Sequence, residues 1–169
     1  RRRATLPAPT GGNTLVMQSG GSTAVLNRSL LGVVREAYRN EGFGEVFGAV
    51  HGLEGLLSRR LIDLSKQTKG QWSRIAHTPG AILGSSRRKL RPEDVPTALD
   101  VLSEYDIRFL FTIGGNDSAE TAQRIGVEAR AAGRPLTVIN VPKTIDNDLA
   151  LTDHSPGYGS AARFVALAT

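Results

Sequence analysis

The hydrophobic residues of the chain gather in short runs that are separated by polar segments and glycines. Short continuous apolar runs are typical of strands buried in a sheet. Such runs predict strands at residues 15–17, 46–50, 109–113 and 136–139. The last two runs are nearly uninterrupted, so we expect strands that are covered on both faces.

Apolar residues at helical spacing occupy the segments between these runs. Leu26, Leu30 and Val34 recur on one face and predict a helix over residues 24–40. A proline followed by two acidic residues is typical of a helix start and predicts a further helix over residues 92–105.

Two more helices are expected in the second half of the chain. One follows the glycine pair at 114–115, where Asp117 and Glu120 can form a capping box. The other covers residues 156–168. Residues 52–91 mix short apolar groups with glycine, serine and charge, and they give no clear prediction.

Strands that alternate with helices favour a doubly wound α/β fold, with a mainly parallel sheet and helices on both faces. In such sheets ligands bind beyond the carboxyl ends of the strands. Unusual loops begin at Ser19, Gly114 and Pro142, each directly after a predicted strand. The pattern alone therefore predicts a ligand site at this edge of the sheet.

The chain has 169 residues, which is enough for one domain with its own core. Residues 1–13 are basic and rich in proline and glycine, so we expect a flexible lead followed by one domain at residues 14–169. There is no cysteine, and no apolar run is long enough to span a membrane. These features are compatible with a cytoplasmic protein.

The formal net charge of +5 raises the question of nucleic-acid binding. Aromatic residues make up 5% of the chain and are not interleaved with the basic ones, so a stacking surface for single strands is missing. A basic balance also suits a pocket for small anionic molecules. We prefer this second interpretation, to which the basic cluster at residues 87–91 contributes.

Two glycine pairs, Gly20-Gly21 and Gly114-Gly115, each lie between a predicted strand and a predicted helix. Because glycine has no Cβ, the backbone can approach a ligand closely, and the helix start favours an anion such as phosphate. One pair alone would be explained by a tight turn, but two pairs in one sheet favour a phosphate site. Neither fits the dinucleotide-binding or Walker-type pattern.

The loop at residues 142–148 combines a lysine, a threonine and two aspartates. One aspartate can accept a proton from a hydroxyl group, and the other can hold Mg²⁺. A lysine can neutralise the charge on a transferring phosphoryl group. Taken alone, however, the segment is better explained as a solvated polar turn.

In combination, these segments resemble the phosphofructokinase family. The order, spacing and strand context of the motifs match, and the resemblance covers residues 14–169. The string Thr-Ile-Asp-Asn-Asp is the most specific part. The motifs are Ser19-Gly20-Gly21, Leu83-Gly84-Ser85-Ser86-Arg87, Gly114-Gly115-Asn116-Asp117-Ser118 and Pro142-Lys143-Thr144-Ile145-Asp146-Asn147-Asp148.

The resemblance implies a phosphofructokinase-like amino-terminal domain with assigned roles. Asp146 is expected to be the base that deprotonates the 1-hydroxyl group of fructose 6-phosphate, with Lys143 as the second catalytic residue. Thr144 and Ile145, together with Asp146, are expected to contact the sugar phosphate. The residues expected to bind the donor diphosphate are Gly21, Gly115 and Arg87.

The resemblance also bears on the phosphoryl donor. ATP-using members generally carry glycine where this chain has Asp117 and Lys143. Both positions favour pyrophosphate, as in the pyrophosphate-dependent 6-phosphofructokinases of glycolysis, which form fructose 1,6-bisphosphate. Two alternatives stay open: an ATP-dependent 6-phosphofructokinase and a non-catalytic fragment that binds phosphate.

Mg²⁺ is the cofactor that the resemblance implies, with Asn116 and Asp148 as ligands. Asn116 stands where the family usually has an aspartate, and a neutral amide is a weaker ligand. Family members continue into a second domain, so we expect this chain to be a truncated piece of a homo-oligomeric parent. The expected partners are pyrophosphate and fructose 6-phosphate, and not nucleic acid or a membrane.

Overall fold

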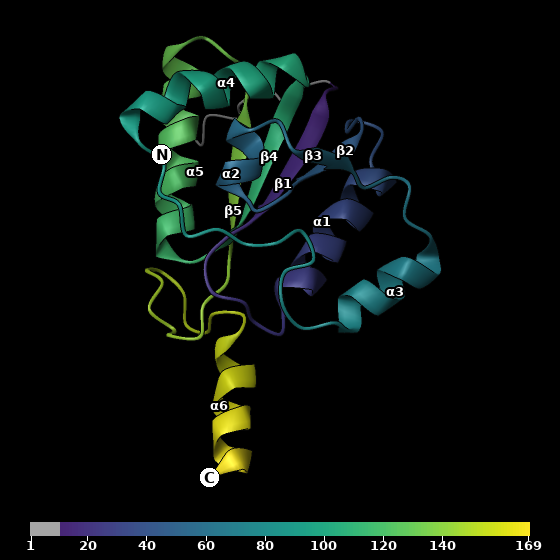
Figure 1. The fold of residues 1–169 in the computed structure, drawn as a ribbon, viewed down its shortest axis with the longest axis vertical. Coiled ribbons are helices and arrows are strands. Elements are labelled where there is room, and N and C mark those ends of the chain that lie inside the picture. The colour runs from purple at the N-terminus through teal and green to yellow at the C-terminus, as the bar shows by residue number, and fades with distance from the viewer. Residues whose placement is uncertain (1–10) are drawn as a thin grey trace, which may run out of the picture.

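The computed structural model describes residues 11–169, which form a five-stranded sheet with helices around it (Figure 1). The spatial order of the strands is β3-β2-β1-β4-β5, and β3 is the one antiparallel strand. The predicted doubly wound, mainly parallel sheet is therefore confirmed. The strands are β1 Asn13–Gln18, β2 Val46–Ala49, β3 Leu61–Asp63, β4 Ile107–Gly114 and β5 Thr137–Pro142.

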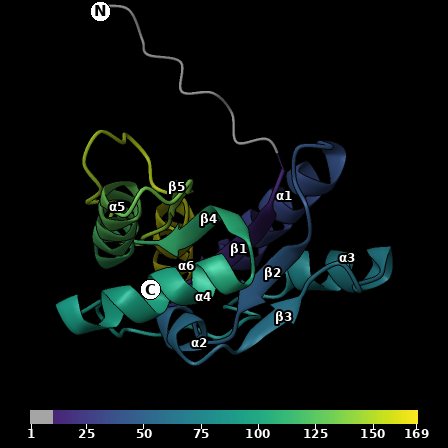
Figure 2. The same cartoon turned by 90° about the horizontal axis from the view of Figure 1, so that it is seen from above.

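Helices cover both faces of the sheet, as Figure 2 shows from above. They are α1 Leu26–Arg39, α2 Leu53–Leu57, α3 Lys69–His77, α4 Val95–Glu104, α5 Asn116–Ala131 and α6 Tyr158–Ala168, with a 3₁₀ turn, η1, at Pro92–Asp94. One apolar core lies between the sheet and α2, α4 and α5. The other lies between the sheet and α1, with part of α3 packed against it.

The central strand β1 contributes to both cores, because successive side chains of a strand point to opposite faces. Leu15 and Met17 pack in the core beneath α2, α4 and α5. Val16 packs on the opposite face with Leu26 and Leu30 of α1. All five side chains are essentially inaccessible to solvent, so β1 is buried on both faces.

β5 differs from the prediction of a strand that is covered on both faces. Its residues are half buried or exposed, and the Ile139 side chain is 42% exposed. Within the described residues β5 pairs with β4 alone and lies at the edge of the sheet. An apolar run predicts a strand but does not distinguish a central strand from an edge strand.

The predicted capping box of Asp117 and Glu120 is wrong. α5 begins at Asn116 with Gly115 as its N-cap, and no side chain caps its first turn. Asp117 therefore lies inside the first turn, and its carboxylate pairs with Lys89 instead. The glycine pair, and not an acidic side chain, sets the start of this helix.

Residues 52–91, which gave no clear prediction, contain α2, β3 and α3. α2 has five residues and β3 has three, so neither is long enough to show a periodic pattern. α3 begins with a capping box in which Thr68 accepts from the Gln71 N–H and Gln71 accepts from the Thr68 N–H. The spacing of these two residues was a usable signal for this helix start.

α6 extends away from the sheet in Figure 1. It begins at Tyr158, slightly later than predicted. None of its residues is buried, and the side chains of Phe164 and Leu167 are 72% and 76% exposed.

Of the predicted lead, residues 1–10 lie outside the described part of the chain, and Asn13 already belongs to β1. Among residues 11–169, no helix has the length and apolar character needed to cross a bilayer.

Candidate functional site

A cavity of about 350 Å³ opens at the carboxyl ends of β1, β4 and β5. Its wall comes mainly from the loop after β1, residues 86–88, the start of α5 and the loop after β5. These segments are far apart in the sequence. The parallel strands bring them together at the edge where doubly wound sheets bind ligands.

The loop after β1 closely approaches the segment that precedes η1. Gly20 has a φ of +80°, a conformation that side chains other than glycine rarely adopt. Its N–H donates to the Ser86 carbonyl at 3.1 Å, and its carbonyl accepts from the Ser85 hydroxyl. A Cβ at Gly20 would also lie 3.2 Å from the Nζ of Lys143 and crowd that ammonium group.

The start of α5 faces the cavity, and Gly114 permits this packing. A Cβ at Gly114 would overlap the Ser118 hydroxyl and lie 3.2 Å from the Ser19 carbonyl oxygen. Gly115 is the N-cap of the sixteen-residue helix. The first N–H groups of a helix have no partners within it, so this end of α5 favours an anion in the cavity.

Lys143 is buried, with 4% of its surface exposed. Its ammonium group donates to the Gly21 carbonyl at 2.6 Å and so joins the loops after β5 and β1. Burial and the neighbouring Arg87 guanidinium lower the pKa of Lys143 below its usual value, while Asp146 opposes this shift. An anion bound in the cavity would stabilise the charged ammonium group.

Two carboxylates lie at the rim of the cavity, next to the buried Thr144. The Asp146 N–H donates to Thr144 Oγ1 at 3.1 Å, and this hydroxyl lies 3.4 Å from Asp146 Oδ2 and 3.5 Å from Asp148 Oδ1. Asn116 Nδ2 donates to Asp148 Oδ2 at 2.8 Å, so α5 positions the second carboxylate. Both aspartates are exposed.

The turn that carries these carboxylates is anchored from behind by the segment before α6. The Thr144 N–H donates to the Pro156 carbonyl at 3.1 Å. The N–H of the fully buried Ser155 donates to Asn147 Oδ1 at 2.8 Å. Asn147 has a φ of +54°, a left-handed conformation that asparagine tolerates better than most residues.

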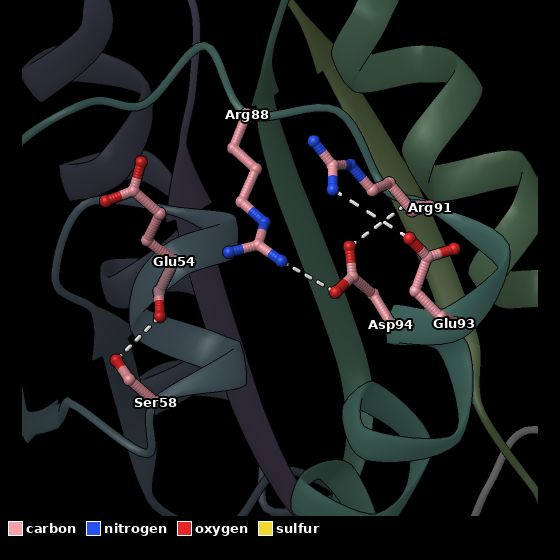
Figure 3. A network of polar contacts seen from close by, with 6 residues as sticks. All are labelled: Glu54, Ser58, Arg88, Arg91, Glu93 and Asp94. Carbon is pink, nitrogen blue, oxygen red and sulfur yellow. Dashed lines mark hydrogen bonds and ion pairs between the residues drawn. The ribbon is translucent and has the colours of Figure 1, made fainter.

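The basic segment before η1 completes the wall. The Arg87 guanidinium lies over Gly21, where a Cβ would be 3.9 Å from its Nη2 atom. Arg88 also lines the cavity, but its guanidinium donates to Asp94 at 2.6 Å (Figure 3). The Arg91 N–H donates to the other carboxylate oxygen of Asp94. Asp94 thereby holds this segment against η1.

The structure brings nearly all predicted site residues into one cavity. Ile145 is the exception, since its side chain is 52% exposed and does not line the wall. Ser86, Arg88 and Thr121 also line the cavity and were not predicted; for Arg88 the signal was its place in the basic cluster. The predicted residues in the wall are Gly21, Arg87, Gly115, Asn116, Asp117, Lys143, Thr144, Asp146 and Asp148.

The oxygen atoms at the rim fit a hydrated divalent cation. Mg²⁺ is usually held by one or two carboxylates together with waters and substrate phosphates. Asp148 supplies a carboxylate, and Asn116 supplies an amide oxygen, because it donates to Asp148 through Nδ2. Three or more acidic or histidine side chains do not converge anywhere in residues 11–169, so a cation here would need phosphate oxygens as well.

Several proteins are similar to this chain in sequence and in fold. The chain is 43% identical over 157 residues to a pyrophosphate–fructose 6-phosphate 1-phosphotransferase of Rhodospirillum rubrum, covering 93% of this chain and 39% of that protein. It is 45% identical over 163 residues to the protein of the same name in Xanthomonas campestris pv. campestris, covering 94% and 38%.

Among solved structures, the pyrophosphate-dependent phosphofructokinase of Marinobacter aquaeolei matches with a TM-score of 0.89 and 39% identity, over 94% of this chain and 40% of that one. The chain thus spans about two fifths of the length of these relatives. The model of the phosphofructokinase family matches residues 13–169, and the chain therefore belongs to the phosphofructokinase family.

Proposed function

We propose that the full-length protein transfers a phosphoryl group from pyrophosphate to the 1-hydroxyl group of D-fructose 6-phosphate. The product is fructose 1,6-bisphosphate, as in glycolysis. We further propose that this protein works in the cytoplasm as a homo-oligomer. The observation that carries the proposal is one cavity whose wall includes glycine backbone, the cations Arg87 and Lys143, and the exposed Asp146.

The donor side of this proposal is supported by the cations and N–H groups in the cavity. Phosphoryl transfer depends mainly on positioning and on stabilising negative charge. Arg87 and Lys143 supply two positive charges, and Gly115 with the start of α5 supplies backbone N–H groups. The bond from Lys143 to the Gly21 carbonyl uses one of three ammonium hydrogens, so two remain for phosphate oxygens.

The acceptor side is supported by the carboxylates at the rim. Asp146 is exposed at the mouth of the cavity, where it can accept the proton of a sugar hydroxyl that attacks the donor. Asp148 and Asn116 would hold Mg²⁺ beside the phosphates. When bound, the cation would neutralise charge that develops on the phosphate oxygens.

The first prediction concerns the donor. The full-length protein is expected to form fructose 1,6-bisphosphate rapidly with pyrophosphate and Mg²⁺, and slowly with ATP. Asp117 places a side chain in the wall that the α-phosphate of a nucleotide would have to pass, and this side chain takes up the room that a glycine would leave. A coupled assay with each donor at equal concentration measures the two rates.

The coupled assay and calorimetry together distinguish this proposal from the ATP-dependent and the non-catalytic alternatives. High turnover with ATP and none with pyrophosphate would assign the chain to the ATP-dependent branch. Binding of pyrophosphate by calorimetry, without product from either donor, would instead favour a non-catalytic phosphate-binding protein. A competing excess of inorganic phosphate serves as the control for non-specific binding to the basic segment.

A second prediction is that residues 1–169 alone give no measurable product. Asp146 and Ile145 are exposed, so a sugar phosphate would meet this chain on one side only. A clamped acceptor can contribute about 10⁵ M or more of effective concentration, and an open rim cannot supply it. The purified chain is incubated with pyrophosphate, Mg²⁺ and fructose 6-phosphate, and product is measured; turnover near that of a typical kinase would contradict this expectation.

A further inference from the structure

A second, smaller hollow of about 80 Å³ lies beside the phosphate cavity. Asp117 and Thr121 line both spaces, so the first turns of α5 separate them. Two cations, Lys89 and Arg124, line the smaller hollow with Glu120. A phosphate chain in the cavity that reached past Asp117 would meet these cations.

Asp117 forms an ion pair with Lys89 at this boundary. Lys89 Nζ lies 3.1 Å from Asp117 Oδ1, and the pKa of Lys89 is raised because Asp117 accepts its hydrogen bond and attracts its charge. The two side chains are 71% and 65% exposed. Exposed ion pairs add little to the stability of a fold. We therefore expect the pair to affect ligand binding in the cavity and not the stability of the fold.

The segment that carries Lys89 is held on both sides. Before it, the Ser85 hydroxyl donates to the Gly20 carbonyl, and Arg88 is fixed on Asp94 (Figure 3). After it, Leu90 is buried in the core beneath α4. These contacts restrict where the Lys89 side chain can reach, and its ammonium group meets the start of α5.

The charge of Asp117 poses a problem for an anion-binding cavity. An uncompensated carboxylate in the wall would repel every phosphate that enters, including pyrophosphate. A lysine in direct contact removes most of this repulsion while leaving the bulk of the carboxylate in place. The ion pair can thus limit the length of the ligand without weakening its binding.

We propose that Lys89 is a specificity-determining residue, whose ion pair with Asp117 closes one end of the phosphate cavity to phosphate chains longer than pyrophosphate. This inference rests on the proposed use of pyrophosphate as donor. It assigns the pair two effects: Lys89 neutralises Asp117 in the presence of pyrophosphate, and the paired side chains together occupy the position where a third phosphate would bind.

The experiment measures binding of pyrophosphate and inorganic tripolyphosphate to the full-length protein by titration calorimetry with Mg²⁺. Tripolyphosphate is used because it lengthens the ligand without adding a base or sugar. Lys89→Met is expected to raise the Kd of pyrophosphate about fivefold, because the loss of Lys89 leaves the Asp117 carboxylate in the cavity wall uncompensated. The matched control is Lys66→Met, which removes an exposed lysine from its ion pair with Asp63 outside the cavity.

Asp117→Gly is expected to lower the Kd of tripolyphosphate about tenfold, because the freed Lys89 ammonium can form a charge-assisted hydrogen bond with the third phosphate. Asp117→Ser is the second variant, since glycine weakens the first turn of a helix. Adding Lys89→Met to either variant should remove the gain for tripolyphosphate and change pyrophosphate binding much less.

The results distinguish this proposal from the proposed function. One outcome is that the wild type binds pyrophosphate, while Lys89→Met changes the Kd of neither anion more than Lys66→Met does, in the wild type or in the Asp117 variants. The role of Lys89 is then wrong and the donor assignment stands. If pyrophosphate is not turned over, yet the gain for tripolyphosphate depends on Lys89, the donor assignment is wrong and the role of Lys89 stands. If no variant binds either anion, both are wrong.

Discussion

Asp146→Asn in the full-length protein is expected to lower kcat by roughly 10²–10⁴, the usual effect of removing a general base. The substitution keeps the shape of the side chain and removes its ability to accept a proton at neutral pH. Asp146 is exposed at the rim, and its backbone N–H, which donates to Thr144, is unaffected. Fold and donor binding should therefore persist, and steady-state kinetics with pyrophosphate measures the loss.

The matched control is Asp153→Asn in the same loop. Asp153 is exposed, and it contacts the turn through its backbone carbonyl, which accepts from Asn147. This variant should keep wild-type kcat. Wild-type kcat for Asp146→Asn as well, with unchanged pyrophosphate binding, would show that Asp146 is a turn residue and not the base.

The fold was predictable where patterns are long and local. The apolar runs of β1 and β4 and the spacing of Leu26, Leu30 and Val34 in α1 each identify their element within a few residues. The exposure of β5 was not predictable, because it depends on which strands lie beside it. The start of α5 was misassigned because Asp117 has the spacing of a cap, while Gly115 is the N-cap.

The candidate site was predictable as a set of segments but not as a set of contacts. Strand ends and glycine pairs placed Gly21, Gly115 and Asp146 at one edge, and the structure brings them into one cavity. The sequence holds no local signal for the burial of Lys143 or for its bond to the Gly21 carbonyl, because these two residues are 122 positions apart. Lys89 was visible as part of a basic cluster, but its partner Asp117 was not.

Lys143→Met is expected to lower kcat by roughly 10²–10³, the usual loss when one donor to a developing oxyanion is removed. Methionine has a similar length and no charge, so the buried space stays filled. The variant loses a cation of the cavity wall and its bond to the Gly21 carbonyl. Kinetics with pyrophosphate measures the effect, and Lys66→Met is the control for loss of an exposed lysine.

A second measurement on Lys143→Met tests the burial of the charge. Burial and Arg87 lower the pKa of Lys143 in the folded protein, so between that pKa and the unfolded value of about 10.4 the unfolded chain binds more protons. The free energy of unfolding of the ligand-free wild type therefore gains with pH across this window, a contribution that the Met variant lacks. Below the window the difference between the two proteins should be constant, and within it the difference should shift in favour of the wild type. Tyrosines titrate in both proteins and cancel. Urea titrations up to pH 10.5 measure this difference in the free energy of unfolding. If it stays constant with pH, Lys143 is as well solvated in the fold as in the unfolded chain, and its charge is not preorganised for a phosphate.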